Sequence, residues 1–207
     1  MTRAYIIGID EVGRGPLAGP LVVSACAIEV GCSVLSLYPK EKLLDSKKLT
    51  TFHRKAILFK ARELEAKEQV VFGLGEVSNE RIDEVGLTQA IKEALLQALE
   101  ALHVKGVSQD SYIYLDGSLK APPGYKQETI IKGDEKIEAI SLASIYAKEY
   151  RDDLMKNLAL QFPEYHFEKH VGYGTRLHVE AIHRHGITPL HRTSFLKHMF
   201  ENEIKEV

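Results

Sequence analysis

Runs of apolar residues with two different spacings divide the chain into strand-like and helix-like segments. Short, nearly continuous apolar runs predict strands at residues 4–10, 21–28, 69–75, 112–115 and 127–131. Apolar positions that recur every three or four residues predict helices at 50–67, 79–103 and 137–160. Strands that come first and then alternate with helices indicate an α/β domain of three layers, with a mixed central sheet flanked by helices.

The composition changes after Phe162-Pro163, where His, Gly and Arg become frequent. We therefore predict a main domain over residues 1–163 and a small helical C-terminal segment over 164–207, with one or two short helices, packed on that domain. In the helix predicted at 137–160, the small residues Ala139, Ala143 and Ala147 recur every four residues. This spacing predicts close packing of one helix face against the sheet.

Composition narrows the class of protein. With 207 residues, of which 44% are hydrophobic and 27% charged, the chain can bury the core of a soluble globular protein. Its apolar runs are too short to cross a bilayer and its N-terminus lacks a signal pattern, so we expect a cytoplasmic protein without a membrane segment. Cys26 and Cys32 form no CxxC pair, and we expect buried thiols rather than a disulfide framework or a zinc site.

The net charge of −2 does not mark a nucleic-acid binder, since such proteins usually carry a basic excess. Between Met155 and Phe200, however, six Lys or Arg and seven His stand against three Glu. Two interpretations stay open: a basic face opposite an acidic pocket, or an ordinary solvated surface with scattered charge. His183, His185 and His191 match no zinc spacing, so we expect them to be exposed or to contact phosphate.

Acidic residues end two of the predicted strands: Asp10 and Glu11 end the first, and Asp116 ends a later one. Neighbours in a regular strand point to opposite faces, so Asp10 and Glu11 can share a site only if the backbone turns there. Carboxylates that gather without matching Lys or Arg repel one another, and Mg²⁺ or Mn²⁺ usually relieves this repulsion. The alternative is that each acid caps a helix or ends a turn.

Two further acids accompany the helix predicted at 137–160. Asp134 precedes the helix, and Asp152 lies eighteen residues later, or about five helical turns. At most one of them is expected to reach the same metal centre, and we choose Asp134. Ser144, Lys148 and Asp152 belong to a polar stripe on this helix, and the alternative role for Asp152 is an ion pair with Lys148 or Arg151.

A glycine-rich segment at residues 13–20 connects the first two predicted strands. Its glycines let backbone amides approach a ligand such as a sugar-phosphate backbone. The segment lacks the Lys-Ser/Thr ending of a P-loop and the spacing of a dinucleotide-binding loop. The alternative interpretation is a tight connection between strands.

Five blocks of sequence, taken in order, resemble ribonuclease HII. They are DEVGRGPLAGP at 10–20, DSKKL at 45–49, LDG at 115–117, KGD at 132–134 with ASIYAK at 143–148 and RD at 151–152, and HVGYGT at 170–175. The resemblance covers about residues 6–195, and the ordered set is far more specific than any single motif. Leu142, Tyr146 and Glu149 depart from the residues common in the family, but none of these departures affects the acids.

The resemblance implies a ribonuclease H-like fold and an endonuclease that hydrolyses the RNA strand of RNA/DNA hybrids, including on the 5′ side of single ribonucleotides in duplex DNA. The acids that match the family's four are Asp10, Glu11, Asp116 and Asp134, with Asp152 as a further candidate ligand. They would hold two divalent cations, Mn²⁺ or Mg²⁺, which activate a water and stabilise the leaving oxygen, giving 3′-hydroxyl and 5′-phosphate ends. In the family, this activity removes misincorporated ribonucleotides or primer remnants from DNA.

The resemblance also implies substrate contacts. A glycine-arginine-glycine loop and a later tyrosine, here Gly13, Arg14, Gly15 and Tyr173, would recognise a ribonucleotide joined to a following deoxyribonucleotide. Further candidates for substrate contact are Lys47, Lys48, Ser144, Lys148, Arg184 and Arg192. The C-terminal segment would complete the substrate site, which takes RNA/DNA hybrids and RNA–DNA junctions. We expect a monomer, and the sequence indicates no protein partner.

Two rival functions remain for comparison. Ribonuclease HIII has the same sheet and acids but carries an additional N-terminal domain and usually a lysine in the loop, whereas here the first strand starts near Met1 and the loop has Arg14. A non-catalytic nucleic-acid-binding module of the same fold would be expected to have lost one or more acids. All four acids are present, which favours the enzyme.

Overall fold

The computed structural model describes residues 3–34 and 49–197. Contacts divide the chain into two compact units. The first unit comprises Met1–Val12, Val22–Glu76 and Lys92–Glu149, and the second comprises Gly13–Leu21, Val77–Ile91 and Tyr150–Val207. Because these units interleave along the chain, they do not test the boundary predicted at residue 163, which stays a prediction.

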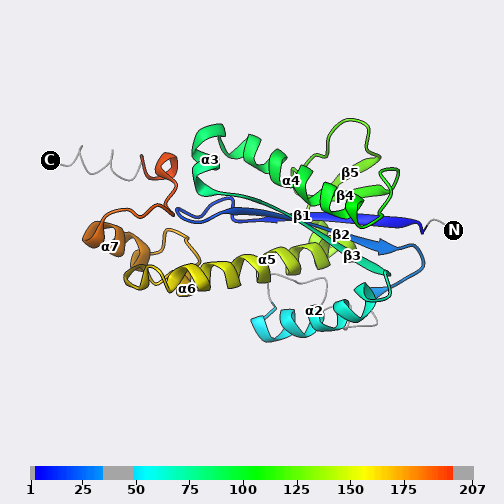
Figure 1. The fold of residues 1–207 in the computed structure, drawn as a ribbon, viewed down its shortest axis with the longest axis horizontal. Helices are drawn as coiled ribbons and strands as arrows, with labels where there is room; N and C mark the ends of the chain where they lie inside the picture. The colour runs from blue at the N-terminus through cyan, green and yellow to red at the C-terminus, as the bar shows by residue number, and fades with distance from the viewer. Residues whose placement is uncertain (1–2, 35–48, 198–207) are drawn as a thin grey trace. The chain divides into compact units, whose positions relative to one another are not determined.

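A single mixed sheet runs through the first unit, with its strands in the order β3-β2-β1-β4-β5 (Figure 1). The strands are β1 (Tyr5–Val12), β2 (Leu21–Glu29), β3 (Val70–Val77), β4 (Tyr112–Asp116) and β5 (Gln127–Ile130). β1 pairs antiparallel with β2 and parallel with β4, and β4 pairs parallel with β5. The predicted strands and the predicted mixed sheet are confirmed.

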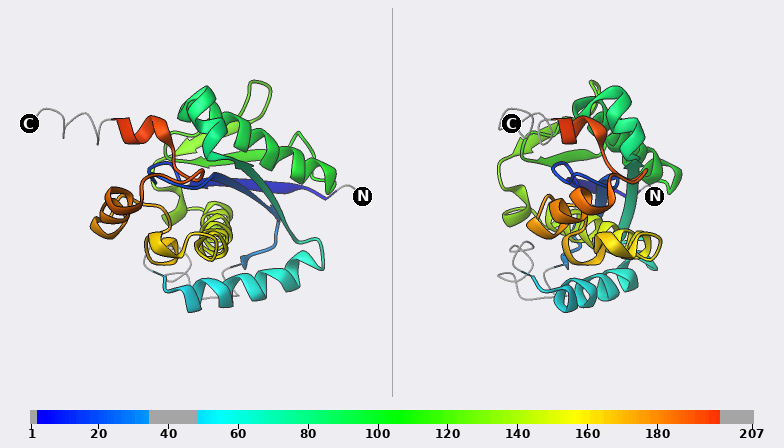
Figure 2. Two further views of the ribbon diagram at one scale, coloured as in Figure 1. Left: turned by 60° about the vertical axis from the view of Figure 1, so that its left-hand side comes forward. Right: turned by 90° about the vertical axis from the view of Figure 1, so that its left-hand side faces the viewer.

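Helices of the first unit cover both faces of this sheet (Figures 1 and 2). The part of α4 (Leu87–Val104) that belongs to this unit lies on one face, and the first half of α5 (Glu138–Ala159) lies on the other together with α2 (Thr51–Glu65). Ile57 of α2 and Leu142 of α5 share a buried cluster with strand residues. The three-layer α/β prediction is therefore confirmed.

Glycines let the helices of the first unit touch the strands closely. A Cβ added to Gly8 of β1 would lie 2.1 Å from the carbonyl carbon of Ala139 in α5, and one added to Gly75 of β3 would lie 1.9 Å from the oxygen of Ala94 in α4. Neither position has room for a side chain. The close packing predicted for Ala139 is confirmed, and Gly8 explains how it is reached.

The single long helix predicted at 79–103 is wrong. The structure has two helices there, α3 (Asn79–Val85) and α4. They are separated by Gly86, which adopts a φ of 79° and donates its N–H to the Ile82 oxygen at 2.9 Å. Only glycine enters this backbone conformation easily, so a glycine within an otherwise helical pattern was the available signal.

The second unit is helical and has a core of its own. Its C-terminal part contains α6 (Phe167–His170), α7 (Arg176–His185) and helical residues 193–197, which is one short helix more than expected. Its core is formed by Ala18, Met155, Ala159, Tyr165, Phe167, Ala181, Ile182 and Leu196. Among the described helices of the whole chain, none is long and apolar enough to cross a membrane.

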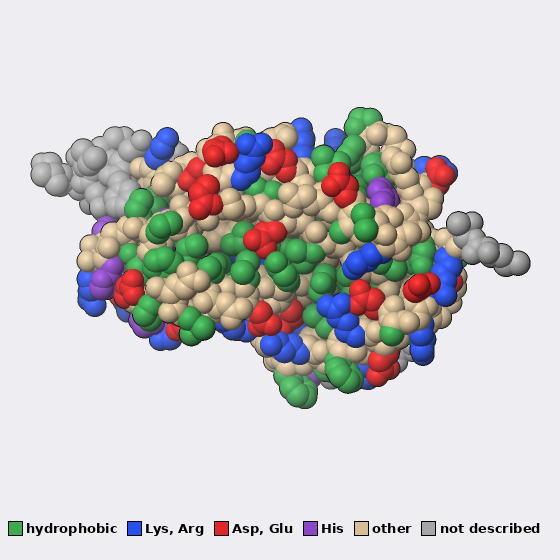
Figure 3. Space-filling model, viewed as in Figure 1, with side chains coloured by type: hydrophobic (Ala, Val, Ile, Leu, Met, Phe, Trp, Pro, Cys, Tyr) green, Lys and Arg blue, Asp and Glu red, His purple; other side chains and the backbone are tan. Residues whose placement is uncertain are grey.

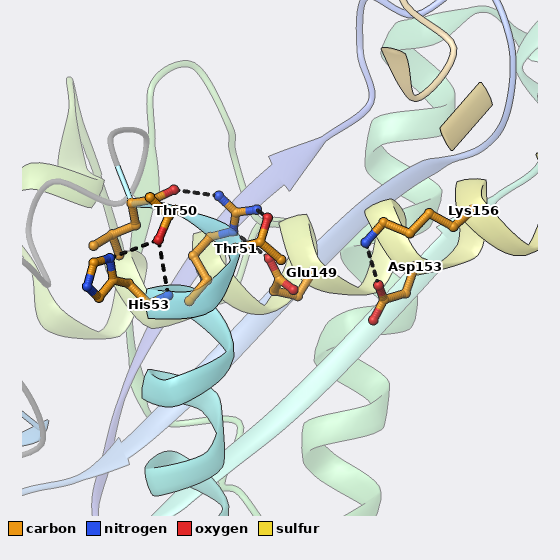
Figure 4. A network of polar contacts seen from close by, with 8 residues as sticks. Thr50, Thr51, His53, Glu149, Asp153 and Lys156 are labelled. Carbon is orange, nitrogen blue, oxygen red and sulfur yellow. Dashed lines mark hydrogen bonds and ion pairs between the residues drawn. The ribbon is translucent and has the colours of Figure 1, made fainter. Parts of the chain in front are cut away.

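Glu149, one of the departures from the family pattern, has a local partner in the first unit. The Arg54 Nε donates to Glu149 Oε1 at 2.5 Å, and both side chains are largely buried. Figure 4 shows Glu149 of α5 facing the start of α2 at Thr50 and Thr51. Tyr146, another departure, packs its ring 4.5 Å from that of Phe72. Both unusual residues are thus accommodated by contacts between α5 and its neighbours.

Both cysteines of the first unit are free thiols. Cys26 is buried, as expected. Cys32 is only half-buried, so the expectation of two buried thiols was wrong for this residue.

Candidate active site

Asp10 and Asp116 lie next to each other at the ends of two parallel strands. The register pairs Ile9 of β1 with Leu115 of β4, so the next positions along the two strands are Asp10 and Asp116. Asp10 is two residues beyond Gly8 and therefore faces α5, where Ser144 hydrogen-bonds its carboxylate. Ser144 was predicted as a candidate for substrate contact, and in the structure its side chain hydrogen-bonds Asp10.

The backbone turn that the sequence analysis made the condition for Glu11 to share a site with Asp10 is absent from β1. β1 continues to Val12, with Glu11 paired to Val23 of β2, so the backbone does not turn between Asp10 and Glu11. The place of Glu11 in a shared site therefore stays a prediction. The Glu11 N–H instead donates to Asp10 Oδ1 at 2.8 Å, and the Glu11 carboxylate is close enough to raise the pKa of Asp10.

Asp134 is connected to Asp116 through its neighbour in the chain. The Gly133 N–H donates to Asp116 Oδ1 at 2.6 Å. Gly133 and Asp134 belong to the short 3-10 helix η3 (Gly133–Glu135), which follows Lys132 in a left-handed conformation with a φ of 54°. Asp134 itself is 1% exposed. A sharp backbone bend therefore brings the segment that carries Asp134 against the end of β4.

The pKa of Asp10 reflects burial first and the negative charge of neighbouring carboxylates second. Burial is the main cause that raises the pKa of Asp10 to about 8, and the carboxylates of Glu11 and Asp116 raise it further. The hydrogen bond from Ser144 acts in the opposite direction but does not compensate. A divalent cation at this position would reverse the repulsion and favour the charged carboxylates.

The ligand atoms available among the predicted acids are of the type that binds hard divalent cations. Asp10, Glu11, Asp116 and Asp134 offer only carboxylate oxygens, which suit Mg²⁺ or Mn²⁺ better than zinc. Within residues 3–34 and 49–197, no three His, Cys, Asp or Glu side chains already converge into a metal-binding group. Carboxylates that repel one another are expected to come together only when a cation neutralises them.

In the second unit, the glycine-arginine-glycine loop meets Tyr173. A Cβ added to Gly15 would lie 3.8 Å from Tyr173 Cε1. Tyr173 is 41% exposed, and Arg14 and Gly15 are exposed as well. The structure therefore brings together two elements that the sequence could only associate through a family resemblance.

For the other predicted site residues, the structure gives placement and exposure but does not test their roles. Lys47 and Lys48 lie outside the described residues. Lys148 is half-buried on α5 and belongs to the first unit, whereas Asp152 is buried and belongs to the second. Arg184 is exposed on α7. The roles proposed for these residues stay predictions.

Charge on the visible surface is mixed. Figure 3 shows acidic and basic side chains interspersed over the face that it presents. On this face, the interpretation as an ordinary solvated surface with scattered charge fits better than a uniform basic face.

Two expectations about the C-terminal residues are wrong. Arg192 is fully buried rather than available to phosphate, and His191 is 2% exposed rather than solvated. The His191 Nε2 lies 3.1 Å from the His178 Nε2, and the rings of His178 and His170 stack with centroids 4.5 Å apart. His178 precedes Ala181 and Ile182 on the buried face of α7, and this helical spacing was the signal for a core histidine.

Comparison with known proteins decides the family. The model of the family described as Ribonuclease HII matches residues 7–202. The chain belongs to the ribonuclease HII family. The ribonuclease HII of Chlamydia pneumoniae is 46% identical over 192 residues, which cover 93% of this chain and 83% of that protein. As a ribonuclease HII, the chain is an endoribonuclease of the ribonuclease H class that cleaves RNA in RNA/DNA hybrids.

Solved structures agree with the fold of the family. The RNase HII in the PCNA:RNase HII complex from Archaeoglobus fulgidus superimposes with a TM-score of 0.69 at 25% identity, over 91% of this chain and 93% of that one. Bst-RNase HIII in complex with Mn²⁺ gives a TM-score of 0.62 at 20% identity, over 89% of this chain and 63% of that one. The second likeness concerns the fold alone.

Proposed function

We propose that this ribonuclease HII cuts on the 5′ side of ribonucleotides, both in long RNA/DNA hybrids and at single ribonucleotides in duplex DNA, and leaves 3′-hydroxyl and 5′-phosphate ends. The observation that carries the proposal is the pair formed by Asp10, which is buried, and Asp116, which is half-buried, at the same end of two adjacent parallel strands. Such a pair is suited to binding divalent cations.

We assign the binding of two divalent ions, Mg²⁺ or Mn²⁺, to Asp10, Glu11, Asp116 and Asp134. The Mn²⁺ complex of Bst-RNase HIII, a protein of the same fold, is consistent with such ligands. When bound, the ions would activate a water molecule and stabilise the leaving 3′ oxygen. The chain orients its own acids: Ser144 holds the Asp10 carboxylate, and the Gly133 N–H holds that of Asp116.

We assign recognition of the ribonucleotide to groups of the second unit and contacts with phosphates to residues of both units. Backbone N–H groups of the Gly13–Gly15 loop would bind the ribonucleotide at the cut, where a 2′-hydroxyl distinguishes RNA from DNA. The Tyr173 ring would stack on the adjacent sugar or base. Lys47, Lys48, Lys148 and Arg184 would contact phosphates and set the position of the duplex.

The deciding experiment is cleavage of an end-labelled DNA duplex that contains one ribonucleotide, beside an all-RNA/DNA hybrid and plain DNA. Each substrate is tested with Mg²⁺, Mn²⁺ or EDTA. We expect metal-dependent incision 5′ of the single ribonucleotide and no cutting of plain DNA. Cutting of the long hybrid alone would indicate a ribonuclease HIII-like specificity. Hybrid binding without cutting at any metal concentration would indicate a non-catalytic binding module.

A further inference from the structure

Arg192 is a fully buried cation of the second unit that bonds to the glycine-rich loop. Its Nη2 donates to the Gly13 oxygen at 2.7 Å and its Nη1 donates to the Arg14 oxygen at 3.1 Å. Its Nε donates to the Gly19 oxygen at 3.0 Å. Within the described residues, the hydrogen bonds of this guanidinium all end on main-chain oxygens. Arg192 therefore connects both ends of the loop.

Keeping a guanidinium in this position is costly. The pKa of Arg192 is lowered to about 9, mainly by burial and also by the positive charge of Arg151, against the opposing effects of Asp83 and Tyr173. The Asp83 carboxylate is itself engaged by Thr193 and Ser194. The fork of donors on an arginine can bond several carbonyls at once, which a lysine ammonium on its flexible stem cannot reproduce.

The anchored carbonyls determine where the loop amides point. In a planar trans peptide, the C=O and the N–H of the next residue point in opposite directions. The Gly13 and Arg14 carbonyls point inward to Arg192, so the N–H groups of Arg14 and Gly15 point away from it. Arg14 and Gly15 are both exposed residues, in agreement with an outward orientation of this peptide segment. The same loop meets Tyr173 at Gly15.

We propose that Arg192 is a positioning residue that aims the Arg14 and Gly15 N–H groups at an oxygen of the substrate ribonucleotide. The inference rests on the proposed function of the loop. Arg192 touches no substrate in this role: it acts through the two carbonyls that it holds. Arg151 supports the same segment, since its Nη2 donates to the Ala18 oxygen at 3.1 Å and its Nη1 to the Val171 oxygen at 2.8 Å, two residues before Tyr173.

The test compares Arg192→Lys with Arg54→Lys, a buried arginine of the first unit that bonds Leu49 and Glu149. Cleavage of the single-ribonucleotide duplex gives KM and kcat, and fluorescence anisotropy in EDTA gives the binding preference for that duplex over plain DNA. Arg192→Lys is expected to raise KM about tenfold and to remove most of the binding preference, a loss on the scale of one or two hydrogen bonds. Arg54→Lys is expected to lower stability but keep KM and the preference, because partial unfolding reduces only the active fraction.

A folded Arg192→Lys enzyme with the KM and preference of the wild type would overturn the inference. If the wild type itself neither cuts nor prefers the ribonucleotide duplex, the proposed function fails instead. Hydrogen exchange of the wild type provides a test that needs no variant. The Gly15 amide is expected to exchange rapidly in the free protein and to become protected by the hybrid. A Gly15 amide that is already protected in the free protein would contradict the outward orientation.

Discussion

The Asp116 carboxylate accepts a 2.6 Å hydrogen bond from the Gly133 N–H, so the residue before Asp134 holds another of the proposed metal ligands. Asn at position 116 keeps an oxygen that can accept this bond but loses the charge. We expect Asp116→Asn to reduce cleavage on the order of 10³-fold, as for other losses of a charge-stabilising group in an active site. Its melting temperature should stay within a few degrees of the wild type, and hybrid binding should largely survive. Residual cleavage near the wild-type rate would remove Asp116 from the site.

Asp10 is expected to limit the stability of the metal-free protein. Because its folded pKa is about 8 against 3.8 in the unfolded chain, its contribution to stability is complete below about pH 4 and is lost as the pH rises through 8. Asp10→Asn removes this titration. In EDTA at pH 8, we expect the variant to melt about 2–4 °C higher than the wild type, which corresponds to roughly 1 kcal/mol, while cleavage is abolished. A variant that melts lower at both pH 6 and pH 8 would contradict the proposed charge repulsion.

The buried histidines of the second unit predict acid sensitivity. Burial lowers the pKa of His178 to about 4 from 6.5, and the pKa values of His170 and His191 are lowered for the same reason. Groups with a depressed folded pKa take up protons on unfolding, so their stabilising contribution is complete above pH 6.5 and is lost as the pH falls towards 4. In the His178→Gln variant, the melting temperature should fall less steeply between pH 7 and pH 5, because unfolding takes up about one proton fewer.

His183→Gln is the matched control for this experiment, since His183 is exposed on the same helix α7. It is expected to melt with the pH dependence of the wild type. An equal effect of both substitutions would show that burial of the histidine cluster is not the cause.

Gly8 is expected to tolerate no side chain. A Cβ there would lie 2.1 Å from the Ala139 backbone, which cannot move without displacing α5 from the sheet. We expect Gly8→Ala to reduce the free energy of unfolding by at least about 3 kcal/mol. Gly31→Ala is the control, because its Cβ would meet nothing within 4 Å and would add only the strain of a φ of 91°. Urea titration of both variants measures the difference, and similar losses would argue against the contact at Gly8.

Local sequence patterns predicted much of the fold. Continuous apolar runs are enough to locate strands, and the order of the elements is enough to indicate three layers. They failed at Gly86, because the helical periodicity continues on both sides of a residue whose backbone conformation ends the helix. The packing of α5 against Gly8 was predicted only in part. The small residues of the helix were evident from the sequence, but the strand residue that they pack against was not.

For the candidate site, position along the chain predicted more than side-chain type. Asp10 and Asp116 lie next to each other because adjacent parallel strands end at the same edge, while the convergence of all four acids stays a prediction. The burial of Arg192 and His191 could not be read from the sequence, since a basic segment looks the same whether its side chains face solvent or bond to carbonyls in the interior. The partners of Arg192 lie far away in the chain, at Gly13 and Gly19, and no periodicity connects them.

The parallel pairing of β1 with β4 also has a consequence for biosynthesis. Tyr112 at the start of β4 follows Val12 at the end of β1 by 100 residues (112 − 12), so this pairing is a non-local contact that forms slowly compared with a hairpin. During synthesis, β1 leaves the ribosome long before β4 and initially pairs only with β2. An incomplete chain that carries Asp10 without Asp116 lacks one of the proposed metal ligands, and we expect it not to cut nucleic acid.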